Sequence, residues 1–208
     1  MAIQELAKEI AKQPANESIA NSSYPFFSKS LKRSGVKVKE NRIRITTNTF
    51  GLALLNPTIP LSITPSRVIF QVNKIIGAVA VGICDQNIVA QHSYDGGGKY
   101  YVNLGTKDHG RYMMYNHGAV YSHSNPKEDG QWTGFKFKSG DVLSVEFDSN
   151  ACTVSYSLSE KTWGLWKSTQ RHVQSVQKQH LKLGPLHFCV WLSCGLMSGA
   201  CDVSLIPM

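Results

Sequence analysis

Short apolar segments that alternate with polar residues, each bounded by turn residues, recur along most of this 208-residue chain. The clearest case is the pair 36–39 and 42–45, in which apolar and basic residues alternate on either side of Glu40-Asn41. Successive side chains of a strand point to opposite faces of a sheet, so this spacing is typical of half-buried strands. The pair is therefore expected to form a β-hairpin.

The same pattern returns at intervals toward the C-terminus. Further strands are expected over residues 50–55, 67–74, 75–84, 142–147, 152–157, 186–192 and 203–206. Asp148-Ser149-Asn150 joins two of them as a hairpin, Asp85-Gln86-Asn87 is expected to be a turn, and the polar residues 159–182 are expected to include a loop. About ten short strands with almost no helix predict an all-β sandwich or barrel.

The N-terminal segment has a different period. Residues 1–13 place apolar side chains on one helical face, and Pro14 ends the helix. A helix this short is marginal alone, so we expect it to dock on the sandwich or on a partner through Ile3, Leu6 and Ile10. The expected organisation is an amphipathic helix and linker over 1–22, followed by one β-sandwich domain over 23–208.

The cellular compartment is predicted from charges and cysteines. Glu5, Lys8, Glu9 and Lys12 interrupt the N-terminal segment where a secretory signal would be apolar. No apolar run reaches the roughly 18 residues of a membrane helix, so no membrane insertion is expected. The five cysteines are odd in number, and most lie inside apolar runs, which is typical of buried thiols in a reducing compartment. A cytoplasmic protein is expected.

Five segments in the middle of the chain form an ordered series: Asp108-His109-Gly110-Arg111-Tyr112, Asn116-His117-Gly118, Tyr121-Ser122-His123-Ser124, Gly134-Phe135-Lys136-Phe137 and Gly140-Asp141 with the strand that follows. Val81-Gly82-Ile83-Cys84 precedes the series, and residues 187–192 follow it. Together they resemble the SPRY family over residues 70–206. Asp108, the inserted His117 and the long segment 159–182 depart from the family pattern.

The resemblance implies a two-layer antiparallel β-sandwich, similar to concanavalin A, in which loops at one edge hold a peptide or a protein surface. It implies no catalysis. The period-two spacing of Phe135, Phe137, Val145 and Phe147 independently predicts that these side chains lie between the sheets.

Aromatic residues in polar or glycine-rich connections mark the expected partner surface, because Tyr and Trp are favoured anchors of protein interfaces. The connections are 94–101, 125–132 and 162–166. The candidate partner-binding residues are Tyr94, Tyr100, Tyr101, Arg111, Trp132, Trp163 and Trp166. The alternative for each aromatic residue is that it caps the core.

A basic hairpin is the second candidate surface in this chain of net charge +8. If the two strands pair around Glu40-Asn41, four cations share one face: Lys37, Lys39, Arg42 and Arg44. This face suits an acidic partner. A solvated outer face is the simpler explanation, because solvent screens such charges. Nucleic acid is disfavoured because no aromatic residues for base stacking are interleaved.

Catalytic and metal sites lack their usual spacing. Cys84-Asp85 has no nucleophile elbow or papain-like neighbourhood, so Cys84 is expected to be a buried thiol. The histidines 109, 117 and 123, and the cysteines 189, 194 and 201, lack zinc-site spacing. The loop Gly96-Gly97-Gly98-Lys99 lacks the Walker pattern. We expect no enzyme, no metal and no cofactor.

The sequence therefore predicts a non-enzymatic protein-binding module, acting as an adaptor or as a subunit of a larger assembly. A lectin-like carbohydrate-binding sandwich is the alternative. It requires Asp, Asn and aromatic side chains that converge on one shallow site.

Overall fold

A computed structural model describes residues 24–46, 49–94, 109–123, 125, 127–162, 165–178, 181, 184–194 and 199–207. The side chains of residues 161–162 and 165–167 are not among the features described. The predicted N-terminal helix over 1–13 lies outside these residues, and the division at residue 22 stays a prediction.

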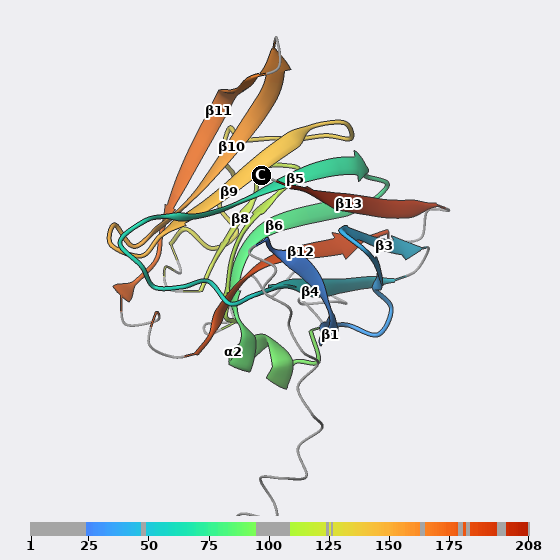
Figure 1. Cartoon of the computed structure of the whole chain (residues 1–208), viewed down its shortest axis with the longest axis horizontal. Helices are drawn as coiled ribbons and strands as arrows, with labels where there is room; N and C mark the ends of the chain where they lie inside the picture. Colours follow the sequence, from blue (N-terminus) through green and yellow to red (C-terminus); the bar gives the residue numbers. More distant parts are fainter. Residues whose placement is uncertain are drawn as a thin grey trace, which may run out of the picture.

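The described residues form an almost entirely β structure, as predicted (Figure 1). The elements are β1 (Phe26–Lys32), β2 (Lys37–Lys39), β3 (Arg42–Thr46), β4 (Phe50–Asn56), β5 (Ser66–Lys74), β6 (Ala78–Asp85), α2 (Gln86–Gln91), β7 (Arg111–Tyr115), β8 (Val120–Ser122), β9 (Val142–Asp148), β10 (Thr153–Thr162), β11 (Leu165–Ser175), β12 (Leu186–Ser193) and β13 (Ala200–Ile206).

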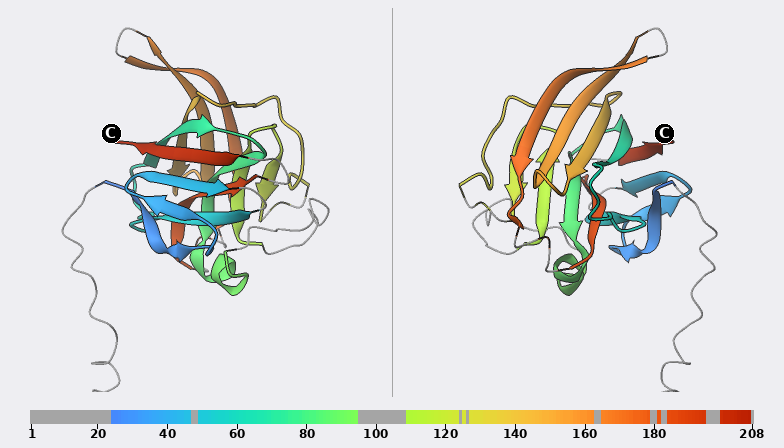
Figure 2. Two further views of the ribbon diagram at one scale, coloured as in Figure 1. Left: turned by 90° about the vertical axis from the view of Figure 1, so that its right-hand side faces the viewer. Right: turned by 60° about the vertical axis from the view of Figure 1, so that its left-hand side comes forward.

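The strands form two antiparallel sheets stacked as a sandwich (Figures 1 and 2). The six-stranded sheet has the order β1-β4-β12-β6-β7-β8, and the seven-stranded sheet has the order β11-β10-β9-β5-β13-β3-β2. Neighbours such as β4 and β12 are far apart in the sequence, so most of the chain must be in place before either sheet is complete.

The core lies between the sheets. Phe70, Phe147 and Tyr156 of the seven-stranded sheet, all under 2% exposed, belong to one apolar cluster with Ile83 and Val190 of the six-stranded sheet. The predicted core residues Phe135, Phe137, Val145 and Phe147 are all buried in this cluster. The two phenylalanines at 135 and 137 lie in an extended segment outside the named strands.

A second apolar cluster covers the outer face of the six-stranded sheet. It contains Leu52, Met113 and Trp191 on the strands, and Val89 of α2 packs on it. Residues of β6 and β12 are therefore buried on both faces, which explains why these strands are almost continuously apolar instead of alternating.

The structure corrects two local predictions. Asp85-Gln86-Asn87 does not form a simple turn: the Asp85 carboxylate caps α2 by accepting the backbone N–H of Ile88 at 3.1 Å. The polar segment 159–182 contains more strand than expected, since its described residues up to Ser175 pair as the β10–β11 hairpin. β11 is an edge strand of the seven-stranded sheet, so fewer of its side chains are buried and its apolar pattern is weaker than in the inner strands.

Truncation of Phe137 tests the core. The side chain is 4% exposed, so the Phe137→Ala variant should lose about 3–5 kcal/mol of unfolding free energy through the lost burial and the cavity that it leaves. Urea denaturation monitored by circular dichroism measures this loss. The exposed neighbour Lys138 provides the control Lys138→Ala, and an equal effect of both substitutions would contradict the core assignment.

Acidification should destabilise the fold through His187. Burial lowers the pKa of this side chain, against the raising effect of a 2.7 Å hydrogen bond from Nδ1 to the Leu55 carbonyl and of the nearby Asp85. The unfolded chain therefore takes up the proton at a higher pH than the folded chain does. Stability is retained above the unfolded pKa of about 6.5 and falls as the pH decreases below it.

Thermal unfolding at pH 7.5 and pH 5.5 measures this effect, and the His187→Gln variant should show a smaller difference between the two midpoints. Identical pH dependence in the variant and the parent chain would assign the acid sensitivity to other groups, such as His117 and His172, whose pKa values burial also lowers.

Candidate functional site

Trp132 is the most prominent candidate of the described aromatic residues. It lies beyond β8, is 69% exposed and pairs through its backbone with Ala119 in an isolated β-bridge. Its ring lies 4.9 Å from the ring of His117, the residue inserted in the Asn-Gly turn. His117, which departs from the SPRY pattern, therefore packs against an exposed tryptophan.

His117 connects Trp132 to a stack of buried rings. The ring centroid of His117 lies 5.3 Å from that of Tyr115, which lies 4.8 Å from Tyr121 and 5.2 Å from Trp191. We call these five residues the aromatic column. Tyr115 and Trp191 belong to β7 and β12 and are almost fully buried, so the column anchors an exposed indole in the six-stranded sheet. Burial, with a smaller effect of Lys136, lowers the pKa of His117, so its ring is neutral at pH 7.

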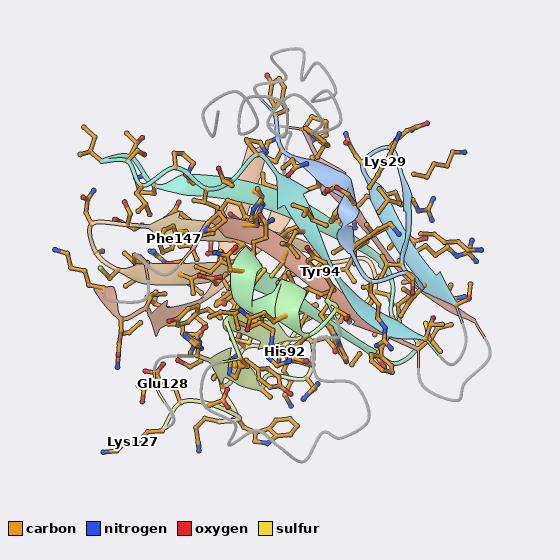
Figure 3. All side chains as sticks on the ribbon, turned by 90° about the horizontal axis from the view of Figure 1, so that it is seen from below. Lys29, His92, Tyr94, Lys127, Glu128 and Phe147 are labelled. Atoms are coloured by element: carbon orange, nitrogen blue, oxygen red, sulfur yellow. The ribbon has the colours of Figure 1, made fainter. Side chains whose placement is uncertain are left out.

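The connection that leads to Trp132 is held by a buried polar pair. One carboxylate oxygen of Asp129 accepts the backbone N–H of Ser122 at 2.9 Å and lies 3.2 Å from Nε2 of His109. Nδ1 of His109 accepts the backbone N–H of Arg111, which leaves the ring proton on Nε2 to be donated to Asp129. The side chains of the pair are only 8% and 5% exposed. Figure 3 shows the neighbouring Lys127 and Glu128 at the periphery of the molecule, away from Tyr94.

Sequence reasoning did not identify this pair. His109 belongs to the SPRY-like motif and Asp129 lies in the connection 125–132, and neither pattern predicts that the two side chains pair. The signal in the sequence is weak, because 20 residues separate the two side chains and nothing in their spacing predicts contact.

The other candidate partner-binding residues are placed differently. Arg111 is 8% exposed, and its guanidinium lies 5.3 Å from the Tyr121 ring, so it packs against the aromatic column. Tyr94 follows α2 and packs on the outer apolar cluster. The C-terminal end of β10 and the helix α2, which Tyr94 follows, lie at opposite ends of the molecule (Figures 1 and 2). Tyr100, Tyr101 and Trp163, and the side chain of Trp166, lie outside the described residues.

The basic hairpin has the predicted register. Lys37 pairs with Arg44, and Lys39 pairs with Arg42. Arg42 is not a free cation, because its guanidinium forms two hydrogen bonds of 2.6 and 2.5 Å with the carboxylate of Asp202, which raise its pKa. Asp202 lies on β13, 160 residues away, so local sequence patterns cannot predict this ion pair. Lys37, Lys39 and Arg44 supply the remaining positive charge of this face.

The predicted buried thiol is confirmed at Cys84, and burial raises its pKa well above the usual value. A thiol in this environment is a poor nucleophile because the reactive thiolate is disfavoured. Within the described part of the chain, no group of three or more His, Cys, Asp or Glu residues is arranged to hold a metal ion. None of the described helices is long and apolar enough to span a membrane.

No protein-family model matches this chain, and neither does any curated protein sequence. Solved structures do match. The SPRY domain of human HERC1 superposes with a TM-score of 0.52 at 14% identity, covering 88% of this chain and 98% of that domain. The PSpry domain of TRIM65 gives 0.57 at 8% identity, over 88% and 90% of the two chains.

Stonustoxin gives a TM-score of 0.54 at 15% identity, over 88% of this chain and 27% of the toxin chain. Identities this low establish similarity of the fold. The two antiparallel sheets, the ordered motifs and the match to two SPRY domains lead to one conclusion: this chain has a SPRY-like β-sandwich fold.

Proposed function

We propose that this chain is a non-enzymatic protein-binding module that holds a peptide or protein partner at the surface around Trp132. It acts as an adaptor or as a subunit of a larger assembly. The observation that carries the proposal is an indole that is 69% exposed and yet fixed by a stack of rings. Leaving such a ring in water is unfavourable, and a partner that covers it recovers the hydrophobic free energy.

The rigidity of the aromatic column favours binding. Ordering a mobile side chain at an interface costs about 0.5–1.5 kcal/mol. Trp132 avoids much of this cost because His117 and Tyr115 already support its ring. Interface hot spots are enriched in Trp, and such residues usually insert into a pocket of the partner.

The partner is expected to be acidic. Lys37, Lys39 and Arg44 create a positive field that accelerates association with a negatively charged surface.

Four of the five cysteines are buried and all are free thiols, which supports the proposal of a cytoplasmic location. The connections 94–101 and 162–166 remain predicted parts of the partner surface.

The arrangement around Trp132 favours protein over carbohydrate at this site. A lectin-like site needs a carboxylate that is available to sugar hydroxyls. Asp129, the carboxylate nearest in sequence, already accepts hydrogen bonds from Ser122 and His109 inside the protein.

Truncation of Trp132 should weaken partner binding. The partner is first identified by a pull-down from the native source with mass spectrometry, and the affinity is then measured with purified components. Trp132→Ala should cost at least about 2 kcal/mol, or roughly 30-fold in the dissociation constant. Ile63, which is 86% exposed in a different connection, provides the matched control Ile63→Ala.

Circular dichroism confirms that both variants fold. If Trp132→Ala binds normally while charge reversal of Lys37, Lys39, Arg42 and Arg44 abolishes binding, the basic hairpin is the partner surface and the proposal is wrong.

Asp129→Ala should act on the same site indirectly. It leaves His109 and the Ser122 N–H without their acceptor, so the connection to Trp132 loosens. We expect faster amide exchange at Gly130 and weaker partner binding, but a smaller loss than with Trp132→Ala. The exposed Lys127 gives the control Lys127→Ala. Unchanged exchange at Gly130 in Asp129→Ala would show that the pair does not position this connection.

A further inference from the structure

A polar hollow lies on the outer face of the seven-stranded sheet, whereas the aromatic column that supports Trp132 is anchored in the six-stranded sheet. It is an open depression of about 280 Å³ over β5, β9, β10 and β11, which lie side by side (Figure 2). Its lining residues are Arg67, Ser144, Glu146, Ser155, Ser157, Ser159, Ser168 and Arg171. Neither the aromatic column nor the basic hairpin contributes to it.

The hollow follows from strand periodicity. Ser144 and Glu146 alternate with the core residues Leu143, Val145 and Phe147 along β9, so their side chains point away from the core. On β10 the serines alternate with Val154 and Tyr156 in the same way. Serine is short, so a row of serines between longer side chains leaves space above the strands.

Two arginines, one from the strand on each side of β9 and β10, form hydrogen bonds with these serines. Arg67 of β5 donates from Nε to Ser144 Oγ at 2.6 Å, and Arg171 of β11 donates from Nη2 to Ser155 Oγ at 3.0 Å. Ser144 pairs with Ser157, and Ser155 pairs with Glu146, so the two receiving hydroxyls are diagonal neighbours on adjacent strands. Such positions lie about 7–8 Å apart. The two guanidinium groups therefore converge on the middle of the hollow.

Both guanidinium groups retain binding capacity. Each carries five N–H donors, and each donates to a serine through one nitrogen in the described structure. The serines hold the two side chains in place, which reduces the entropy lost when a ligand binds. Guanidinium forks match phosphate, sulfate and carboxylate groups.

Glu146 gives the hollow an acceptor beside these donors. It is the cross-strand neighbour of Arg67, yet among the described residues it forms no ion pair within 4.0 Å. Arg67 donates instead to Ser144. A carboxylate in this position can accept hydrogen bonds from hydroxyl groups of a ligand, as can the serines.

We propose that this hollow binds an anionic saccharide, in which a phosphate, sulfate or carboxylate lies beside free hydroxyl groups. The oxyanion interacts with Arg67 and Arg171, and the sugar hydroxyls interact with Glu146 and the serine row. None of the described lining residues is aromatic or large and apolar, and such side chains are what anchor peptides at interfaces. The volume also suits one or two sugar units better than an extended chain.

Calorimetric titration of the full chain tests the ligand class. The probes are glucose 6-phosphate, glucuronate, glucose, inorganic phosphate and a short polyglutamate peptide. We expect glucose 6-phosphate, glucuronate or both to bind with a dissociation constant of about 1 mM or lower. The first two probes distinguish a phosphate from a carboxylate source. Glucose and inorganic phosphate should each bind at least about tenfold more weakly, because each lacks half of the contacts.

Variants assign the binding to the hollow. Arg67→Ala and Arg171→Ala should each weaken binding by about tenfold or more. Ser157→Leu should abolish it by filling the floor. Lys74→Ala removes an exposed cation at the other end of β5, outside both the hollow and the basic hairpin, so it is the matched control and should bind like the parent chain.

Four results would overturn the proposal. Phosphate binding as tightly as glucose 6-phosphate would indicate a simple anion site. Tighter binding of polyglutamate that is lost in Arg67→Ala and Arg171→Ala would indicate that the hollow is a peptide surface. An equal loss in Lys74→Ala would indicate general surface charge. The absence of binding by both anionic sugars in this concentration range would exclude the site. None of these results affects the proposal for Trp132, because its residues are not tested here.

Discussion

The packing of one face of each sheet against the other is the constraint on which the rest of the molecule depends. Phe70, Phe147 and Tyr156 must point inward together with Ile83 and Val190. Because side chains alternate along a strand, fixing the inward positions also fixes the outward ones. A shift of one residue in β9 or β10 would bury the serine row and expose the core. Packing of the core thus determines which side chains of each strand face outward.

The two outer faces then differ because the two sheets have different sequence patterns. In the six-stranded sheet, β6 and β12 are buried throughout, and an apolar cluster with Met113 and Trp191 requires cover from α2. In the seven-stranded sheet, serines and charged residues face outward. The aromatic column therefore lies on the apolar outer face of the six-stranded sheet. The polar hollow lies on the outer face of the seven-stranded sheet, where polar side chains face the solvent. Protein recognition and saccharide recognition fit these two environments respectively.

Local patterns predicted the parts of the structure that local physics determines. The pairing of Lys37 with Arg44 followed from alternation and a two-residue turn, and the burial of Phe135 and Phe137 followed from their spacing. Patterns failed where contacts join distant residues or where an element is too short to show a period. Asp202 reaches Arg42 across 160 residues, and α2 has only six residues. The sequence predicts Trp132 as a candidate, but the contact between its ring and that of His117 is visible only in the structure.

One polar bridge between the sheets connects the elements that carry the two proposed surfaces. The Gln174 side chain on β11 donates to the backbone carbonyl of Tyr121 on β8 at 2.5 Å, and its amide oxygen accepts the Tyr156 hydroxyl at 3.1 Å. Tyr121 belongs to the aromatic column, and Arg171 of the hollow lies on the same strand as Gln174. Gln174 is 2% exposed, so loss of these bonds would leave buried polar groups unsatisfied. Coupling between the surfaces requires an element with two arrangements of differing free energy. A buried bridge whose amide both donates and accepts a hydrogen bond disfavours a second arrangement, so the two surfaces should bind their ligands independently.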